Sequence, residues 1–272
     1  MNFEKKLTVL DAKGYKNATF EIVEVNSLDG TPSADMAMQL FFANEQGLKM
    51  RFIRIHLNEA SIKTEAGALY YYHGKIKSKS NIGGVSGYLT KSIKGSLTNE
   101  STIKPEYEGT GVIYLEPSTS HYLIVELDNS SLIIDKALFY CCSSEISVEP
   151  WAQKNISAAL LGGEGLFQIC LRGTGVAVLE MPVPLDEIQT VELEPGDECK
   201  VDGSFAIMRD ASVDFAVTKS DKSLLASAKN GEGLLNTFST KVGGRVWLAP
   251  TAPFYKRMMY GMSSSNNSSN NS

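Results

Sequence analysis

The sequence predicts an all-β protein in which three related units form one body, and three observations lead to this fold class. Short segments alternate apolar and polar side chains, which is the pattern of half-buried strands, and turn residues separate them. Segments with the length and capping residues of a helix are scarce. The chain is also similar to itself at a period of about 66 residues, which indicates internal repetition.

The first strands are predicted in the N-terminal part of the chain. Residues 18–25 alternate in the manner of a strand, and turn residues follow them. Further strands are expected at residues 36–42 and 50–57, and another begins after Gly67 with Ala-Leu-Tyr-Tyr-Tyr-His. Residues 75–99 are rich in Gly, Ser, Asn and Lys, which predicts a long excursion from the compact body.

Matching segments define three predicted blocks, at about residues 51–117, 122–182 and 188–250. Each block closes with an apolar strand that runs from Gly to Leu and is soon followed by Pro, at residues 111–115, 175–179 and 244–248. The first two blocks also share Gly-Thr-Gly-Val.

A unit of this size buries too little surface to fold by itself. We therefore expect one domain over residues 1–262 that contains the three blocks. Residues 263–272 are Ser and Asn alone, so they are expected to form a disordered tail.

Composition limits the classes of function. A net charge of -5 and a pI near 5.4 argue against a surface committed as a whole to nucleic acid. No run is apolar enough for a membrane span or a signal peptide, which favours a cytoplasmic location. The four cysteines have neither paired spacing nor a secretory context, so they are expected to be reduced and buried.

Several linked motifs resemble one known family. They are Glu65-Ala-Gly-Ala-Leu-Tyr-Tyr71, Gly163-Glu-Gly-Leu-Phe167, its copy Gly231-Glu-Gly-Leu-Leu235, and the closing elements that run from Gly to Leu and are soon followed by Pro. Over about Phe20 to Pro250 the chain resembles the mitochondrial-biogenesis proteins named for altered inheritance of mitochondria.

The resemblance implies a β-rich body like that of the tryptophan RNA-binding attenuation protein, a short double-stranded β-helix, here triplicated within one chain. It implies no established enzyme activity and no cofactor. The yeast relatives are tied to the mitochondrial inner membrane, whereas this chain lacks a targeting segment, which suggests a bacterial type.

Three glutamates occupy equivalent positions in the blocks: Glu100, Glu164 and Glu232. If a pseudo-threefold axis relates the blocks, the three carboxylates converge and form a site for a ligand or a hard cation such as calcium. The alternative is that each glutamate accepts hydrogen bonds from the amides of its own Gly-rich turn. The sequence leaves both readings open.

A second candidate site is a basic segment beside a run of tyrosines. Its lysines include Lys75, Lys77, Lys79, Lys91 and Lys94. Lysines next to aromatic rings can hold single-stranded RNA or an anionic membrane surface, by phosphate neutralisation and stacking. The alternative is a solvated lysine-rich loop.

The motifs give little support for a nucleophilic serine, a histidine metal site or a phosphate site. The chain has no Gly-x-Ser-x-Gly elbow for a nucleophilic serine, and its three histidines are scattered. Gly173-Thr174-Gly175 precedes an apolar strand and no helix, which predicts a tight β-turn and no phosphate site.

The function predicted from the sequence is therefore a non-enzymatic assembly or scaffold protein. Sheet edges pair readily between chains, so we expect a homo-oligomer, a trimer or a ring, and a protein partner is compatible with this role. The alternative is a module that binds a small ligand, a metal or an anionic polymer.

Overall fold

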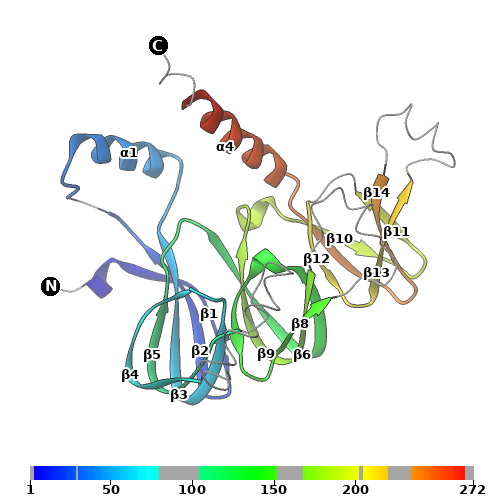
Figure 1. Ribbon diagram of the computed structural model, residues 1–272, viewed down its shortest axis with the longest axis horizontal. Helices are drawn as coiled ribbons and strands as arrows, with labels where there is room; N and C mark the ends of the chain where they lie inside the picture. Colours follow the sequence, from blue (N-terminus) through cyan, green and yellow to red (C-terminus); the bar gives the residue numbers. More distant parts are fainter. Residues whose placement is uncertain are drawn as a thin grey trace, which may run out of the picture. The chain divides into compact units, whose positions relative to one another are not determined.

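The computed structural model describes residues 3–28, 30–79, 104–151, 168–201, 205–219 and 234–266. The described chain is predominantly β, which confirms the predicted fold class at this level (Figure 1). Its contacts divide it into two compact units. Unit 1 comprises residues 1–130, 139–147 and 173–181, and unit 2 comprises residues 131–138, 148–172 and 182–272.

Unit 1 is built on strand β3, which hydrogen-bonds to neighbours along both of its edges. Its elements are η1 (Phe3–Lys6), β1 (Leu7–Tyr15), β2 (Ala18–Val25), α1 (Ala34–Glu45), β3 (Arg51–Thr64), β4 (Leu69–Lys79), β5 (Glu106–Leu115) and β7 (Phe139–Ser143). All pairings are antiparallel: β1 with β2, β2 and β5 with β3, β4 with β5, and β7 with the end of β3. Strands β6 (His121–Asp135), β8 (Ser147–Trp151) and β9 (Gln168–Met181) each contribute residues to both units.

The core of unit 1 follows from the alternation along its strands. In β2, Phe20 and Ile22 point to the same side as Ile53 and Ile55 of β3, and all four are buried. Ile113 of β5 is also fully buried in this cluster. The predicted strands at residues 18–25 and 50–57 are thereby confirmed, because their apolar positions form one packed face.

The strand predicted at residues 36–42 is wrong, because this segment lies in helix α1. The Ser33 hydroxyl accepts a hydrogen bond from the amide of Met36 at 3.2 Å and caps the first turn. Asp35 adds a negative charge in that turn, where the helix dipole favours it. The following Ala, Met, Gln and Leu residues are good helix formers, which decides the local structure. Figure 1 shows α1 beyond the ends of the two strands that it connects.

The glycines of Gly-Thr-Gly lie within strands, and the tight turn predicted at residues 173–175 is wrong. Gly109 of β5 has a φ of 137°, and a Cβ atom there would lie 2.0 Å from the Lys75 carbonyl oxygen of β4. Gly175 of β9 has a φ of 154°, and a Cβ atom there would lie 2.9 Å from the Cβ atom of Ser143 in β7. These glycines let two backbones approach more closely than any side chain would allow.

Unit 2 contains strands of a large sheet and, separate from it, a smaller sheet. Its elements are η2 (Lys136–Leu138), η4 (Leu185–Glu187), β10 (Gln189–Leu193), β11 (Glu198–Val201), β12 (Ala206–Asp210), β13 (Val213–Lys219), β14 (Leu234–Thr240), β15 (Gly244–Leu248) and α4 (Ala252–Asn266). Strand β12 pairs with β6 and β15, β15 pairs with β10, and β14 lies between β11 and β13. Phe238 and Val246 are buried in its core.

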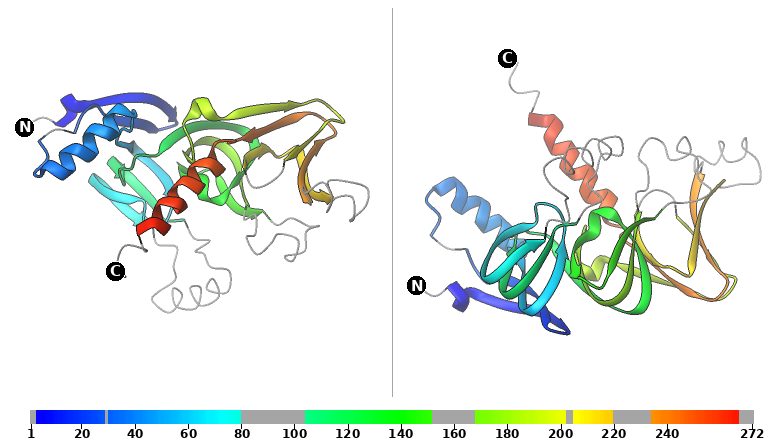
Figure 2. Two further views of the ribbon diagram at one scale, coloured as in Figure 1. Left: turned by 90° about the horizontal axis from the view of Figure 1, so that it is seen from above. Right: turned by 60° about the horizontal axis from the view of Figure 1, so that its bottom comes forward.

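Helix α4 follows β15 directly (Figure 2). It ends at Asn266, so its last residues belong to the stretch for which the composition predicted a disordered tail.

The close approach at Gly109 has a measurable consequence. We expect Gly109→Ala to lower the free energy of unfolding by about 2–4 kcal/mol, because the methyl group meets the Lys75 carbonyl at a φ that side chains rarely adopt. Urea unfolding followed by circular dichroism measures this. The matched control is Gly14→Ala in β1, where the nearest atoms lie 3.8 Å from the added carbon. Equal stabilities of the two variants would contradict the account.

Candidate functional site

A pocket of about 580 Å³ opens on unit 1, where turns and strand segments meet. The turn between β1 and β2 supplies Lys16, and the turn after β7 supplies Glu145. Its other charged lining residues are Glu59 of β3, Lys75 and Lys77 of β4, and Glu108 of β5. Three lysines and three glutamates balance in charge, so the pocket suits a small polar molecule better than a strong anion.

Lys16 and Glu145 form an ion pair at the wall of the pocket, with 2.5 Å between Nζ and Oε1. The hydrogen bond to Glu145 raises the pKa of Lys16 above its ordinary value. Burial raises the pKa of Glu145, but the hydrogen bonds from Lys16, its own backbone and Ser144 outweigh burial, so the net pKa of Glu145 is lowered. This pair joins residues that lie far apart in the sequence.

Glu59 enters the pocket through an irregularity in β3. The register with β5 shifts between Leu57 and Ala60, and Glu59 adopts a φ of 55°. Its amide donates a hydrogen bond to Oγ1 of Thr110 at 3.0 Å, which fixes the bulge. A non-glycine residue in this conformation is uncommon, and here it directs an exposed carboxylate to the pocket lining.

The structure brings the predicted lysines Lys75, Lys77 and Lys79 together on β4. They alternate with buried Ile76, so the three side chains share the outer face of the strand. Lys79 pairs with Glu108 at 2.5 Å, whereas Lys75 and Lys77 form no ion pair with any residue that the structure describes.

Other predicted site residues fall outside the described part of the chain. They are Lys91, Lys94, Glu100, Glu164 and Glu232. The convergence of the three glutamates therefore stays a prediction.

Strand β4 pairs with β5 alone among the described strands, so it forms an edge of the sheet. Lysines along an edge oppose pairing with a second chain, because their charges repel and need water. The row of Lys75, Lys77 and Lys79 therefore protects this edge, and Lys75 and Lys77 also line the pocket.

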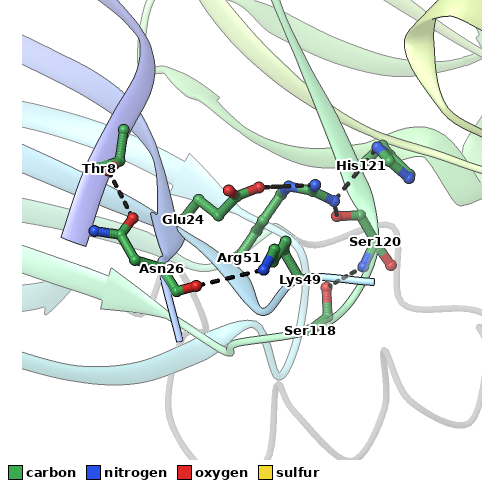
Figure 3. A network of polar contacts seen from close by, with 8 residues as sticks. All are labelled: Thr8, Glu24, Asn26, Lys49, Arg51, Ser118, Ser120 and His121. Atoms are coloured by element: carbon green, nitrogen blue, oxygen red, sulfur yellow. Dashed lines mark hydrogen bonds and ion pairs between the residues drawn. The ribbon is translucent and has the colours of Figure 1, made fainter. Parts of the chain in front are cut away.

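A network of polar contacts around Arg51 joins β2, β3 and the start of β6 (Figure 3). The Arg51 guanidinium lies 2.8 Å from the Glu24 carboxylate and also reaches the Ser120 carbonyl and Nδ1 of His121. The Arg51 and Glu24 side chains are only 12% and 18% exposed, so their pairing holds the strands in place. This network gives His121 a structural role.

The thiols of Cys141 and Cys142 are poor nucleophiles in this fold. Cys141 and Cys142 of β7 are fully buried, and burial raises the pKa of Cys142 to about 12. Burial also raises the pKa of Cys141. It separately raises the pKa of the half-buried Cys199. A thiol that stays protonated at neutral pH neither attacks a substrate nor binds a metal readily. Within the described ranges, no three His, Cys, Asp or Glu side chains form a metal-binding group.

Arg209 is a buried cation in unit 2. Its guanidinium donates to the Val213 carbonyl at 2.9 Å and to the Gln168 side chain at 3.2 Å, and it lies over the Trp151 ring. Burial lowers its pKa to about 10. These contacts hold β12 against the start of β13, which is a structural role.

Two exposed apolar helices are the feature that the sequence reasoning missed. No side chain of α1 is buried, and Met36, Met38, Phe41 and Phe42 are 45–61% exposed. In α4, Phe254, Met258 and Met259 are 52–71% exposed. The Ser33 cap and the good helix formers after it were the signal that could have identified α1. No helix in the described ranges is long and apolar enough to cross a membrane.

Comparison with known proteins assigns this β-rich chain to a family. The sequence profile of the family described as "Mitochondrial biogenesis AIM24" matches residues 42–251, so the chain belongs to that family, as its motifs had indicated. No curated protein matches the chain. A crystal structure of a protein from Streptococcus pyogenes is similar in fold, with a TM-score of 0.55 and 17% sequence identity over 78% of this chain and 94% of the other.

The Lys16–Glu145 pair predicts a pH dependence. A carboxylate whose pKa is lowered by folding stabilises the protein above its unfolded pKa, and this contribution is lost as the pH falls through its folded pKa. We expect stability to fall less steeply between about pH 5 and pH 3 in Glu145→Gln than in the natural chain. Lys16→Met removes the partner and should flatten the profile similarly. Urea midpoints of the natural chain and both variants, measured across this pH range, test the ion pair. The same dependence of stability on pH in all three proteins would contradict its contribution.

Proposed function

We propose that this protein is a non-enzymatic scaffold that self-associates in the cytoplasm. The observation that carries the proposal is helix α1, which presents large apolar side chains and buries none of them. A helix of twelve residues is marginal in water by itself, because packing of an apolar face supplies most helical stability. A second copy of the chain is the occupant that would cover it.

The β4 edge of the sheet is a weaker candidate for contact between copies. Its row of lysines opposes edge-to-edge pairing. The exposed methionines and phenylalanines of α1 carry no such protection, and clustered exposed apolar side chains are typical of interaction surfaces. Association through α1 therefore accounts better for the surface than association through β4.

We also propose that the chain is built from three related units, as in the tryptophan RNA-binding attenuation protein. Gly111, Gly175 and Gly244 support this, because each has a φ of 154–158°. Each faces a β-branched side chain of a neighbouring strand or turn: Ile76, Ile146 and Val213. A chain with this internal plan suits a trimer or a ring of copies.

A further detail supports a relation between the first two units. The amides of Glu59 and Asn129 donate to the hydroxyls of Thr110 and Thr174, at 3.0 and 2.9 Å. Both amides belong to residues with positive φ, and both hydroxyls lie in a Gly-Thr-Gly segment. The same contact between an amide at positive φ and a threonine hydroxyl thus occurs twice in the chain.

The proposal predicts a mass in solution well above the 29.6 kDa of one chain. Light scattering during gel filtration measures it. Phe41→Ser with Phe42→Ser should shift the protein toward one chain, because the exposed rings that drive association are removed. The matched control is Val242→Ser, which changes an apolar side chain that is 75% exposed in unit 2.

A mass of one chain at every concentration would contradict self-association. In that case the alternative, a small-ligand module at the pocket beside Lys75 and Lys77, becomes the better account. Thermal melting with a panel of small polar molecules would then identify its ligand.

A further inference from the structure

We propose that helix α1 of one copy packs antiparallel against helix α4 of a second copy. This inference rests on the proposed self-association and names the two surfaces that meet.

The beginning of α4 is fixed to unit 2. The hydroxyls of Thr251 and Tyr255 both donate to the carboxylate of Glu187 in η4, with 2.8 Å for the tyrosine. The helix is therefore held at its first turn.

The exposed part of α4 is amphipathic. Phe254 and Met258 are four residues apart and Met259 follows, so these three exposed side chains form one apolar face. At about 100° per residue, Lys256 and Arg257 flank this face. An apolar face flanked by basic residues suits an apolar partner that carries acidic residues.

Helix α1 has this composition. Its charged residues are Asp35 and Glu45, and it has no basic residue, whereas α4 has no acidic residue. Pairing α1 with α1 or α4 with α4 brings like charges together, while pairing α1 with α4 brings opposite charges together. The charges therefore favour pairing of α1 with α4 over pairing of either helix with its own copy.

The antiparallel direction follows from the positions of the charges. It places Lys256 and Arg257, near the start of α4, beside Glu45 at the end of α1. It also aligns the two helix dipoles favourably.

Met38, Phe41 and Phe42 of α1 lie within about 100° of one another and span about 6 Å, while Phe254 to Met259 of α4 spans about 8 Å, at 1.5 Å and 100° per residue. Methionine side chains adapt their shape to a partner, and both helices carry them. An anionic lipid surface would attract α4 but repel the acidic residues of α1, so it would leave α1 uncovered.

Charge exchange between two variants tests the pairing. Variant one carries Lys256→Glu and Arg257→Glu, and variant two carries Asp35→Lys and Glu45→Lys. Each variant by itself should self-associate at least about tenfold more weakly than the natural chain, because like charges now face each other. Mixed in equal amounts, the two variants should associate more strongly than either variant by itself, since each contact between unlike variants regains opposite charges. Analytical ultracentrifugation measures all four samples, and Lys241→Glu, at an exposed lysine in the turn between β14 and β15, is the control.

The outcomes separate this inference from the proposed function. If the natural chain self-associates and both variants do so equally well, the helix pairing is wrong and the scaffold proposal stands. If the natural chain is a single chain at every concentration, both fall. If vesicles of phosphatidylglycerol bind the natural chain and not variant one, while variant one assembles normally, α4 covers lipid and the pairing is wrong. Circular dichroism confirms that each variant is folded.

Discussion

Hydrogen bonding along both edges of β3 is the constraint on which unit 1 depends. Over its fourteen residues β3 pairs with β2 and β7 on one side and with β5 on the other. These pairings fix which side chains enter the core, and the bulge before Ala60 directs Glu59 to the pocket. They also hold β5 in place, whose glycines then admit β4 at close range. The pocket and the lysine row follow from the arrangement around one strand.

In this arrangement the strands of unit 1 are paired and packed, whereas helix α1 is left uncovered. Ion pairs such as Arg51–Glu24 and packed side chains such as Phe20 account for the strands within unit 1. Helix α1 shares in none of this packing, and its Met and Phe side chains remain in water. Burial of such a side chain contributes at most roughly 1.5–3 kcal/mol when it goes from fully exposed to fully buried, so a contact that covers α1 would be stabilising. The exposed apolar side chains of α1 are the physical basis of the scaffold proposal.

Much of the β architecture could be predicted from sequence, because period-2 alternation in segments such as residues 18–25 reports directly on the buried face. The family was also identified from linked motifs that recur along the chain. Helix α1 was missed because Met36, Met38 and Leu40 alternate with other residues as a strand does, and the cap at Ser33 and the helix formers after it distinguish the two. The pocket could not be predicted, because the Lys16–Glu145 pair depends on tertiary structure and has no local signal.

Hydrogen exchange at the amides of residues 34–45 tests the central claim, that a second copy covers α1, most directly. Exchange is measured by mass spectrometry at concentrations above and below the point at which the assembly dissociates, with β3 as the internal reference. The account predicts slow exchange of the α1 amides in the assembly and fast exchange in the single chain, while β3 exchanges slowly in both. Equally fast exchange of the α1 amides in both states would contradict it.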